Sequence, residues 1–209
     1  DTSVCTRTYE ESSGMYDGPP DAWQRGVSTP CTDTVASPFT NLASLKSAVD
    51  RCLDVEPSGE NCCSSGLANC GPACAVDMPD WDVSQVTNMD NLFNEKSSFN
   101  QDISRWDTSS VTSMRNMFNS ASSFTASDLA DWNVGKVTDM YRMFGGRWDW
   151  RPFNLSLSRW DVGEVTTMGN MFSAAYAFNS DISAWDVSKV TDMSSMFYYC
   201  YEFASDLSE

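Results

Sequence analysis

The sequence contains no histidine, so it lacks the commonest general base and the commonest protein ligand for metal ions. Basic side chains are scarce, because 13 Lys and Arg stand against 29 Asp and Glu, giving a net charge of −16. A field of that sign repels phosphate backbones and anionic membranes, so we expect no nucleic-acid binding. No apolar run reaches the ~20 residues of a membrane-spanning helix. Because the chain also lacks G-x-S-x-G, P-loop and C-x-x-C motifs, we predict no enzymatic activity, no cofactor and no direct membrane insertion.

Cysteine is nearly absent from the second half of the chain and is concentrated in the first. Of the eight cysteines, seven lie within residues 1–80, namely Cys5, Cys31, Cys52, Cys62, Cys63, Cys70 and Cys74. Zinc is one explanation for such a cluster, but paired C-x-x-C knuckles are lacking, so we favour disulfides and an oxidising compartment. Cys200 lies far along the chain, and it is interpreted either as an apolar filler or as a thiol that links two chains.

Repetition dominates the rest of the sequence. Units of the pattern W-[DN]-[VT]-[SG]-x-V-T-x-M-x-x-[ML]-F occur at spacings of 25, 26, 28 and 25 residues, and they begin at Trp81, Trp106, Trp132, Trp160 and Trp185. A period in this range predicts stacked repeats, each of which buries its apolar face against its neighbours. We therefore predict a cysteine-rich N-terminal cap at residues 1–80, with one helix at about 41–53, followed by a five-repeat solenoid at residues 81–209.

Each unit combines two kinds of periodicity. In the last unit the residues around Trp185 fit an extended segment, whereas Met193, Met196 and Phe197 follow the i, i+3, i+4 spacing of a short helix. This combination predicts an α/β fold. Thr191 precedes the methionine face and is predicted to cap the helix. The alternative is that Thr191 and the equivalent threonines of the other units form a column of hydroxyl groups that binds ordered water.

The repeated phrase resembles the BspA-like, leucine-rich-repeat-related surface repeats of the DUF285 family. The segment from Phe178 to Val187 reads much like the family pattern, and the match recurs five times across residues 81–209. Residues 39–53 and 78–81 are similar to the segment that precedes such repeats in some algal and other protist proteins. The resemblance implies a leucine-rich-repeat-like solenoid of ~25-residue repeats and a secreted or surface-anchored protein used in adhesion or matrix assembly. It implies no catalytic residues.

The third unit departs most from the pattern, because its loop is longer. That loop places aromatic and cationic side chains where the other units have small residues: Arg147, Trp148, Trp150 and Arg151, with Arg142 nearby. Exposed Trp and Arg anchor interfaces, and Trp faces stack on sugars, so we predict a site for a glycan or an acidic partner. A plug that covers a wider gap in the stack is the alternative. Asn154 begins the only N-glycosylation sequon.

Acidic residues recur directly after the tryptophans, and stacking would bring them close together. They are weak candidates for a calcium site: Asp82, Asp107, Asp161 and Asp186. We favour the interpretation that each side chain caps its own turn by accepting from backbone N–H groups. No metal is therefore predicted.

These patterns predict a secreted or cell-surface structural or adhesion protein that acts by protein–protein assembly in an extracellular coat, matrix or filament. Glu209 falls where the next tryptophan would come, so we expect an open C-terminal solenoid end that pairs with a protein partner or another copy. The alternative function is recognition of a glycan or other ligand by the insertion in the third unit. The absence of an initial methionine fits either a mature secreted protein or a shortened chain.

Overall fold

A computed structural model describes residues 36–125, 129–146 and 156–204. Its helices precede the repeats: α1 (Leu42–Val55) is followed by two short 3₁₀ helices, η2 (Gly71–Ala73) and η3 (Met78–Asp80). The bounds of α1 are close to the predicted 41–53. The helix begins after Asn41, whose side chain accepts a hydrogen bond from the Ser44 N–H at 2.9 Å. Such a bond satisfies one of the N–H groups that a helix leaves unpaired at its start.

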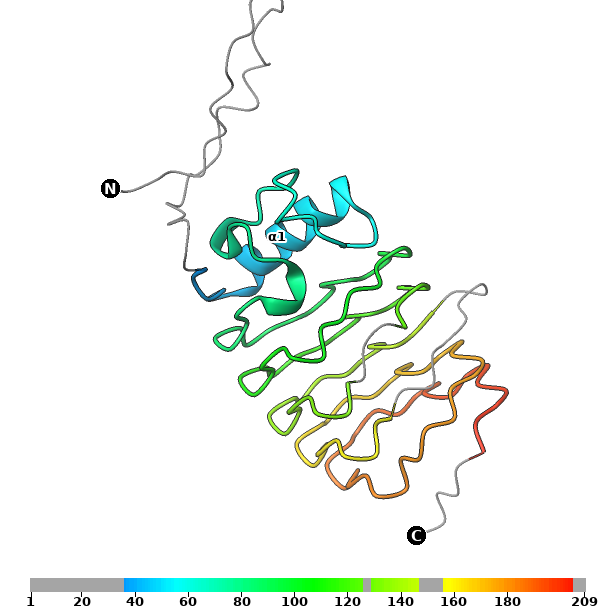
Figure 1. Cartoon of the computed structure of the whole chain (residues 1–209). Helices are drawn as coiled ribbons and strands as arrows, with labels where there is room; N and C mark the ends of the chain where they lie inside the picture. The colour runs from blue at the N-terminus through cyan, green and yellow to red at the C-terminus, as the bar shows by residue number, and fades with distance from the viewer. Residues whose placement is uncertain (1–35, 126–128, 147–155, 205–209) are drawn as a thin grey trace, which may run out of the picture.

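Residues 36–80, called the head below, lie across one end of a stack of repeats (Figure 1). The buried face of α1 consists of Leu45, Ala48, Val49, Cys52 and Leu53. Phe39, which precedes α1, is fully buried, and its ring lies 5.0 Å from that of Trp81. Its N–H donates to the Asp82 carbonyl at 2.8 Å. The head thus covers the apolar side of the first repeat.

The repeats lie side by side in one direction (Figure 1). We number them from the head: repeat 1 (residues 81–105), repeat 2 (106–131), repeat 3 (132–159), repeat 4 (160–184) and repeat 5 (185–204). Single parallel β-bridges connect each repeat to the next, and they join Asn88 to Ser113, Ser113 to Asp139, Asp139 to Thr167, and Thr167 to Asp192. In the part of the chain that the structure describes, these bridges remain isolated and do not extend into longer strands.

One set of backbone hydrogen bonds between neighbouring repeats recurs along the whole stack. From Met89 onward, four alternate N–H groups of repeat 1 donate to four carbonyls of repeat 2, at 2.8–2.9 Å. The same four positions donate forward from repeat 2 to 3, from 3 to 4 and from 4 to 5. Other bonds run the other way. The Ser123 N–H donates to the Ser97 carbonyl at 3.0 Å and the Glu202 N–H donates to the Tyr176 carbonyl at 3.1 Å. The N–H and hydroxyl of Thr112 both donate to the Thr87 carbonyl, at 2.7 and 3.0 Å. This threonine row continues to Thr191.

The threonines therefore do not cap helices, and the helix expected on the methionine face is absent from the described repeats. The reason is a left-handed backbone at two positions in most repeats: Asn91 and Glu95, Asn116 and Ser120, Arg142, Asn170 and Ala174, Ser195 and Tyr199. A residue with positive φ ends a right-handed helix. The chain instead makes successive tight turns, such as Leu92 N–H to Met89 carbonyl at 3.3 Å and Lys96 N–H to Phe93 carbonyl at 3.1 Å.

These turns still direct the i, i+3 and i+4 side chains inward, where they form ladders along the stack. The rings of Phe93, Phe118, Phe144, Phe172 and Phe197 stack at centroid distances of 5.5, 5.6, 5.8 and 5.9 Å. The five tryptophans that begin the repeats are nearly buried, and the indole N–H of each donates to a backbone carbonyl earlier in the chain, as that of Trp160 does to Leu129 at 2.8 Å. Each tryptophan therefore fills the core and also ties its repeat to the preceding structure.

The left-handed positions give a direct test of this turn geometry. Asn116 has a φ of 53°, and its side-chain amide donates to Asn91 Oδ1 at 3.1 Å. Asn116→Ile is expected to cost about 2 kcal/mol more than Asn116→Gly, because a β-branched residue resists positive φ whereas glycine accepts it. Urea unfolding of the two variants measures the difference. Equal stabilities would mean that the backbone is not left-handed at this position.

Candidate functional site

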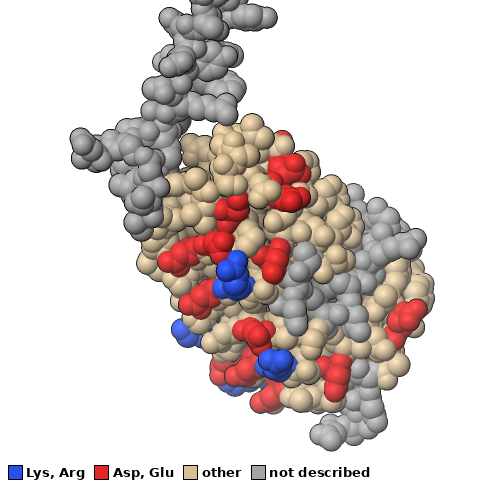
Figure 2. Space-filling view, viewed as in Figure 1, with Lys and Arg blue, Asp and Glu red and all other residues tan. Residues whose placement is uncertain are grey.

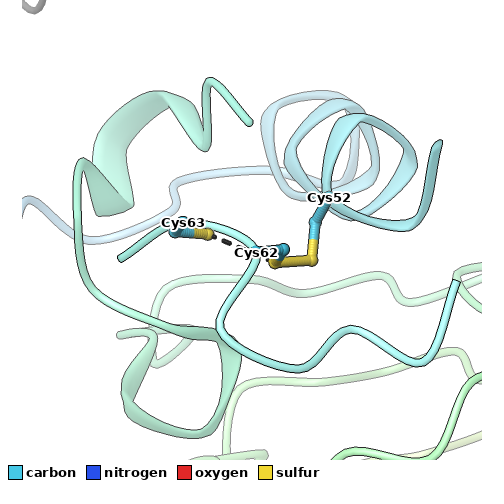
Figure 3. A group of neighbouring side chains, drawn as sticks. All are labelled: Cys52, Cys62 and Cys63. Carbon is cyan, nitrogen blue, oxygen red and sulfur yellow. Dashed lines mark hydrogen bonds between the residues drawn. A yellow bond between two sulfur atoms is a disulfide. The ribbon is translucent and has the colours of Figure 1, made fainter. Parts of the chain in front are cut away.

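The cysteines of the head form disulfides, as predicted. Cys52 on α1 is bonded to Cys62, and Cys63 is bonded to Cys70. Figure 3 shows Cys52 projecting from the helix toward Cys62, with Cys63 beside it. The Cys62 and Cys63 sulfurs are 3.6 Å apart, and these four cysteines are buried. Cys74 is also disulfide-bonded, whereas Cys5 and Cys31 lie outside the described residues.

The aspartates that follow the tryptophans each bind their own turn. The Ser84 N–H donates to Asp82 Oδ1 at 3.1 Å and the Ser109 N–H donates to Asp107 Oδ1 at 3.0 Å. Asp161 and Asp186 accept in the same way, and Asn133 takes this role in repeat 3. Within the described ranges no three carboxylates converge as metal ligands would. The only cluster of possible metal-binding side chains there is Cys52, Cys62 and Cys63, and these cysteines are bonded in disulfides.

Because of these hydrogen bonds, the stability of the fold is expected to depend on pH in the acid range. Hydrogen bonds from the serine side chain and N–H lower the pKa of Asp107, Asp181 and Asp186 below the ordinary 3.8. A carboxyl group with a lowered pKa in the folded state stabilises the fold above pH 3.8, and this contribution is lost as pH falls through the folded pKa. Thermal unfolding midpoints are therefore expected to fall below pH 4. The effect per residue is small because these groups are exposed to solvent.

Asp107→Asn provides the control for that titration, since asparagine already holds the equivalent turn at Asn133. The variant keeps an oxygen acceptor but has no proton to gain. Its unfolding midpoint should respond less to acid than that of the natural chain. An identical pH response would show that Asp107 contributes nothing to the acid dependence.

The visible face of the stack is acidic. Figure 2 shows Asp and Glu side chains spread over the head and the repeats, with few Lys or Arg among them. Some of the basic residues are engaged in ion pairs between segments, as Lys96 is with Asp50 at 2.7 Å and Arg105 with Asp80 at 2.7 Å. An acidic macromolecule would be repelled by this face.

Most of the predicted binding loop lies outside the described residues, which exclude Arg147, Trp148, Trp150, Arg151 and the sequon residue Asn154. Arg142 is described. It is half-buried, and its side chain lies so close to Gly145 that a Cβ there would be 2.4 Å from Arg142 Cγ. Within the described ranges three buried polar atoms have no hydrogen-bond partner, namely Asn119 Oδ1, Ser120 Oγ and Arg142 Nε. The Ser120 N–H also donates to the Gly145 carbonyl at 2.8 Å. The structure thus places Arg142 against the stack.

The side of repeat 5 that faces away from repeat 4 is called the end face here. Side chains that are buried in the earlier repeats are exposed on it. Met193 is 42 % exposed, whereas the equivalent methionines, such as Met168, are 0 % exposed. Val187 is 39 % exposed against 1 % for Val162. Tyr198 and Tyr201 are also largely exposed. An apolar surface of this kind on a protein commonly marks an interaction site.

The backbone of the end face also lacks partners. Met193, Ser195 and Phe197 occupy the positions whose N–H groups donate forward in repeats 1–4. Their N–H groups have no acceptor among the residues that the structure describes. The Thr191 carbonyl, which would receive the next threonine, is likewise unpaired within that part of the chain. The sequence predicted an open end, but it did not indicate which backbone groups it would present.

Cys200 of repeat 5 is a free thiol. It is half-buried, and its sulfur donates to the Phe172 carbonyl at 2.9 Å. Burial raises the pKa of the Cys200 thiol to about 11. The group is therefore protonated at neutral pH and is a weak nucleophile. A link between two chains through Cys200 stays a prediction.

No helix in the described residues is long and apolar enough to cross a membrane. No curated protein and no solved structure matches the chain. A family model does match, over residues 65–151 and again over residues 148–209, and the two matches together span more than half of the chain. Both matches take in the tryptophan-led repeats described above. The chain therefore belongs to the DUF285 family, described as Mycoplasma protein of unknown function.

Proposed function

We propose that this chain is a secreted or cell-surface structural or adhesion protein that acts by binding other proteins in an extracellular coat, matrix or filament. The observation that carries the proposal is the end face, where Val187 and Met193 are exposed although their equivalents in earlier repeats are buried. Burying such apolar surface against a partner is favourable by about 25 cal/mol per Å². The end face therefore offers a site where assembly gains free energy.

The disulfides support an extracellular location. Cys52–Cys62 and Cys63–Cys70 are buried in the head, and bonds of this kind form and persist in oxidising compartments. We also propose that the stack is a leucine-rich-repeat-like solenoid related to the BspA-like surface repeats. Two observations support this relation: the parallel bridges between repeats, and the forward N–H to carbonyl bonds that recur between each pair of neighbouring repeats.

We further propose that the chain is not an enzyme. The polar side chains that recur in the repeats have structural partners: the aspartates bind their own turns and the threonines bind the preceding repeat. A catalytic site needs a unique constellation rather than a repeated one.

The test is retention of the tagged chain in the extracellular material of the producing cells. In Val187→Glu/Met193→Glu the retained fraction is expected to fall about tenfold or more, which corresponds to a loss of ~1.4 kcal/mol in binding. Leu67→Glu is the matched control, because Leu67 is an exposed apolar residue of the head. Equal retention of both variants and the natural chain would reject assembly through the end face.

Glycan recognition by the loop of repeat 3 is a second candidate function. The observation that favours it is that Ser120 Oγ and Arg142 Nε, two buried polar atoms with no hydrogen-bond partner among the described residues, belong to residues that contact Gly145, just before that loop. Loss of a glycan-array signal in Trp148→Ala/Trp150→Ala, with retention unchanged, would support this candidate. Unchanged glycan binding would reject it.

A further inference from the structure

Four sulfur atoms converge at one buried point of the head. Cys52 projects from α1 toward Cys62, and the Cys63 sulfur lies 3.6 Å from that of Cys62 (Figure 3). The sulfurs of Cys52, Cys62 and Cys63 all lie within 4.8 Å of one another, and Cys70 is bonded to Cys63. These four residues, called the sulfur cluster below, are at most 2 % exposed. The two disulfides therefore form one compact group rather than two separate cross-links.

Backbone contacts that do not depend on the S–S bonds hold the sulfur cluster together. The Cys63 N–H donates to Asp77 Oδ1 at 3.0 Å, which supports the turn that carries Cys62 and Cys63. The Ala68 N–H donates to the Cys62 carbonyl at 3.1 Å, and this bond draws the segment before Cys70 toward the same turn. The remaining member of the cluster lies on the buried face of α1. We therefore expect the four thiols to stay near one another when the disulfides are reduced.

The spacing of the sulfurs fits a tetrahedral thiolate site. A Zn²⁺ ion bound by four cysteines has Zn–S distances of about 2.3 Å, which place the sulfurs about 3.8 Å apart. The Cys62 and Cys63 sulfurs are already 3.6 Å apart. The two bonded pairs would separate to this distance by small side-chain rotations. The sequence has no C-x-x-C knuckles, but the fold brings the four sulfurs together from α1, the following turn and the segment before η2.

We propose that the reduced head binds one Zn²⁺-like ion through Cys52, Cys62, Cys63 and Cys70, and that oxidation to the two disulfides releases the ion. In the reduction, each disulfide takes two electrons and two protons from one dithiol, which becomes a disulfide itself. The four thiols then lose four protons as they bind the ion as thiolates. In the oxidation, the four thiolates give four electrons to two small-molecule disulfides, which become four thiolates. The ion leaves because the thiolate, and not the disulfide, is the metal ligand.

The chemistry of the sulfur cluster selects the class of ion. The chain has no histidine, and the carboxylate at this turn, that of Asp77, already accepts from backbone N–H groups. Four thiolates favour Zn²⁺ over Mg²⁺ or Ca²⁺, which prefer oxygen ligands. Short segments with small cores are commonly stabilised by disulfides or by a metal ion. The ion would thus keep α1 tied to the rest of the head while the cysteines are reduced.

Co²⁺ is the probe, because its absorption spectrum depends on its ligands and geometry. The full chain is reduced with a phosphine, which becomes the phosphine oxide, and is titrated with Co²⁺ in the absence of oxygen. We expect one equivalent to bind with the visible bands of a tetrahedral thiolate complex, and one equivalent of Zn²⁺ to displace it. The unreduced chain should show no such bands. Their absence from the reduced chain would overturn the inference.

Alkylation of the reduced natural chain locates the ligands without any substitution. With Zn²⁺ bound, Cys52, Cys62, Cys63 and Cys70 should react with iodoacetamide at least about tenfold more slowly than without it, because bound thiolates are poor nucleophiles. Cys200 should react at the same rate in both states. Peptide mass spectrometry measures each rate. Protection that falls instead on the other cysteines of the chain would contradict the assignment.

Two variants provide a matched comparison. Cys52→Ser/Cys62→Ser removes half of the ligand set, so the affinity for Co²⁺ should fall about a hundredfold or more. Cys200→Ser leaves the set complete and should bind as the natural chain does. Equal affinity of the two variants would mean that the sulfur cluster is not the site.

Oxidation of the Zn²⁺-loaded chain tests the release step. As a small-molecule disulfide restores the two S–S bonds, a chromophoric chelator should record one Zn²⁺ ion for every two disulfides formed. Disulfides that form while the ion stays bound would overturn the release step. This inference goes beyond the proposed function and is independent of it, because the end face contains none of these cysteines. Failure of metal binding would leave the retention experiment unaffected.

Discussion

Replacing Trp132 by alanine is expected to lower the free energy of unfolding by about 3–5 kcal/mol, the usual cost of deleting a buried aromatic side chain. Trp132 is 3 % exposed, and its ring lies 6.1 Å from that of Phe118 in repeat 2. Its indole N–H also donates to the Ile103 carbonyl at 3.1 Å. Because a domain of this size is stable by only about 5–15 kcal/mol, urea unfolding should detect the loss readily.

Trp132→Phe separates packing from hydrogen bonding. Phenylalanine keeps an aromatic ring but cannot donate, so the Ile103 carbonyl would lose its partner. We expect a cost of about 1–2 kcal/mol from that loss. Full stability in the phenylalanine variant would contradict the role given to the indole N–H. A cost equal to that of alanine would mean that the ring itself contributes little.

Removing the two described disulfides is expected to have an effect of similar size. The bonds close loops of 10 and 7 residues. Loop-closure entropy predicts about 2.5 kcal/mol for each of them. The variants are Cys52→Ala/Cys62→Ala and Cys63→Ala/Cys70→Ala, compared by denaturant unfolding under non-reducing conditions. The head should lose its protection against amide exchange before the repeats do, because both disulfides lie within it.

Cys200→Ser is the matched control for the disulfide variants. Cys200 is a free, half-buried thiol, so its replacement breaks no cross-link and should change stability by less than about 1 kcal/mol. Stability that is the same in the double-alanine variants and the natural chain would show that the disulfides do not support the head.

Much of the arrangement follows from the spacing of the tryptophans. Their period predicted units that stack on their neighbours, and the parallel bridges join the units in that order. The prediction of a helix on the methionine face was wrong, because i, i+3, i+4 spacing directs side chains to one side in a run of tight turns as well as in a helix. The sequence did contain a signal for the turns. Asparagine recurs at Asn91, Asn116 and Asn170, and this residue accepts positive φ more readily than most.

The candidate site was less accessible to sequence reasoning. The position of Glu209 suggested an open end, but the exposure of Val187 and Met193 depends on which side of each turn faces the next repeat. The direction of the N–H groups depends on a series of turns with left-handed residues at two positions in most repeats, and no single residue type specifies that series. The predicted loop site was proposed from residue types, and of its members only Arg142 lies in the described residues.

Amide exchange of the end face tests the central claim most directly. It compares the isolated chain with the chain in its native extracellular assembly. We predict that Met193, Ser195 and Phe197 exchange rapidly in the isolated chain, unlike Met168, Asn170 and Phe172, and that they become protected in the assembly. Equal exchange at Met193, Ser195 and Phe197 in the two states would contradict the account, because the end face would then have no partner.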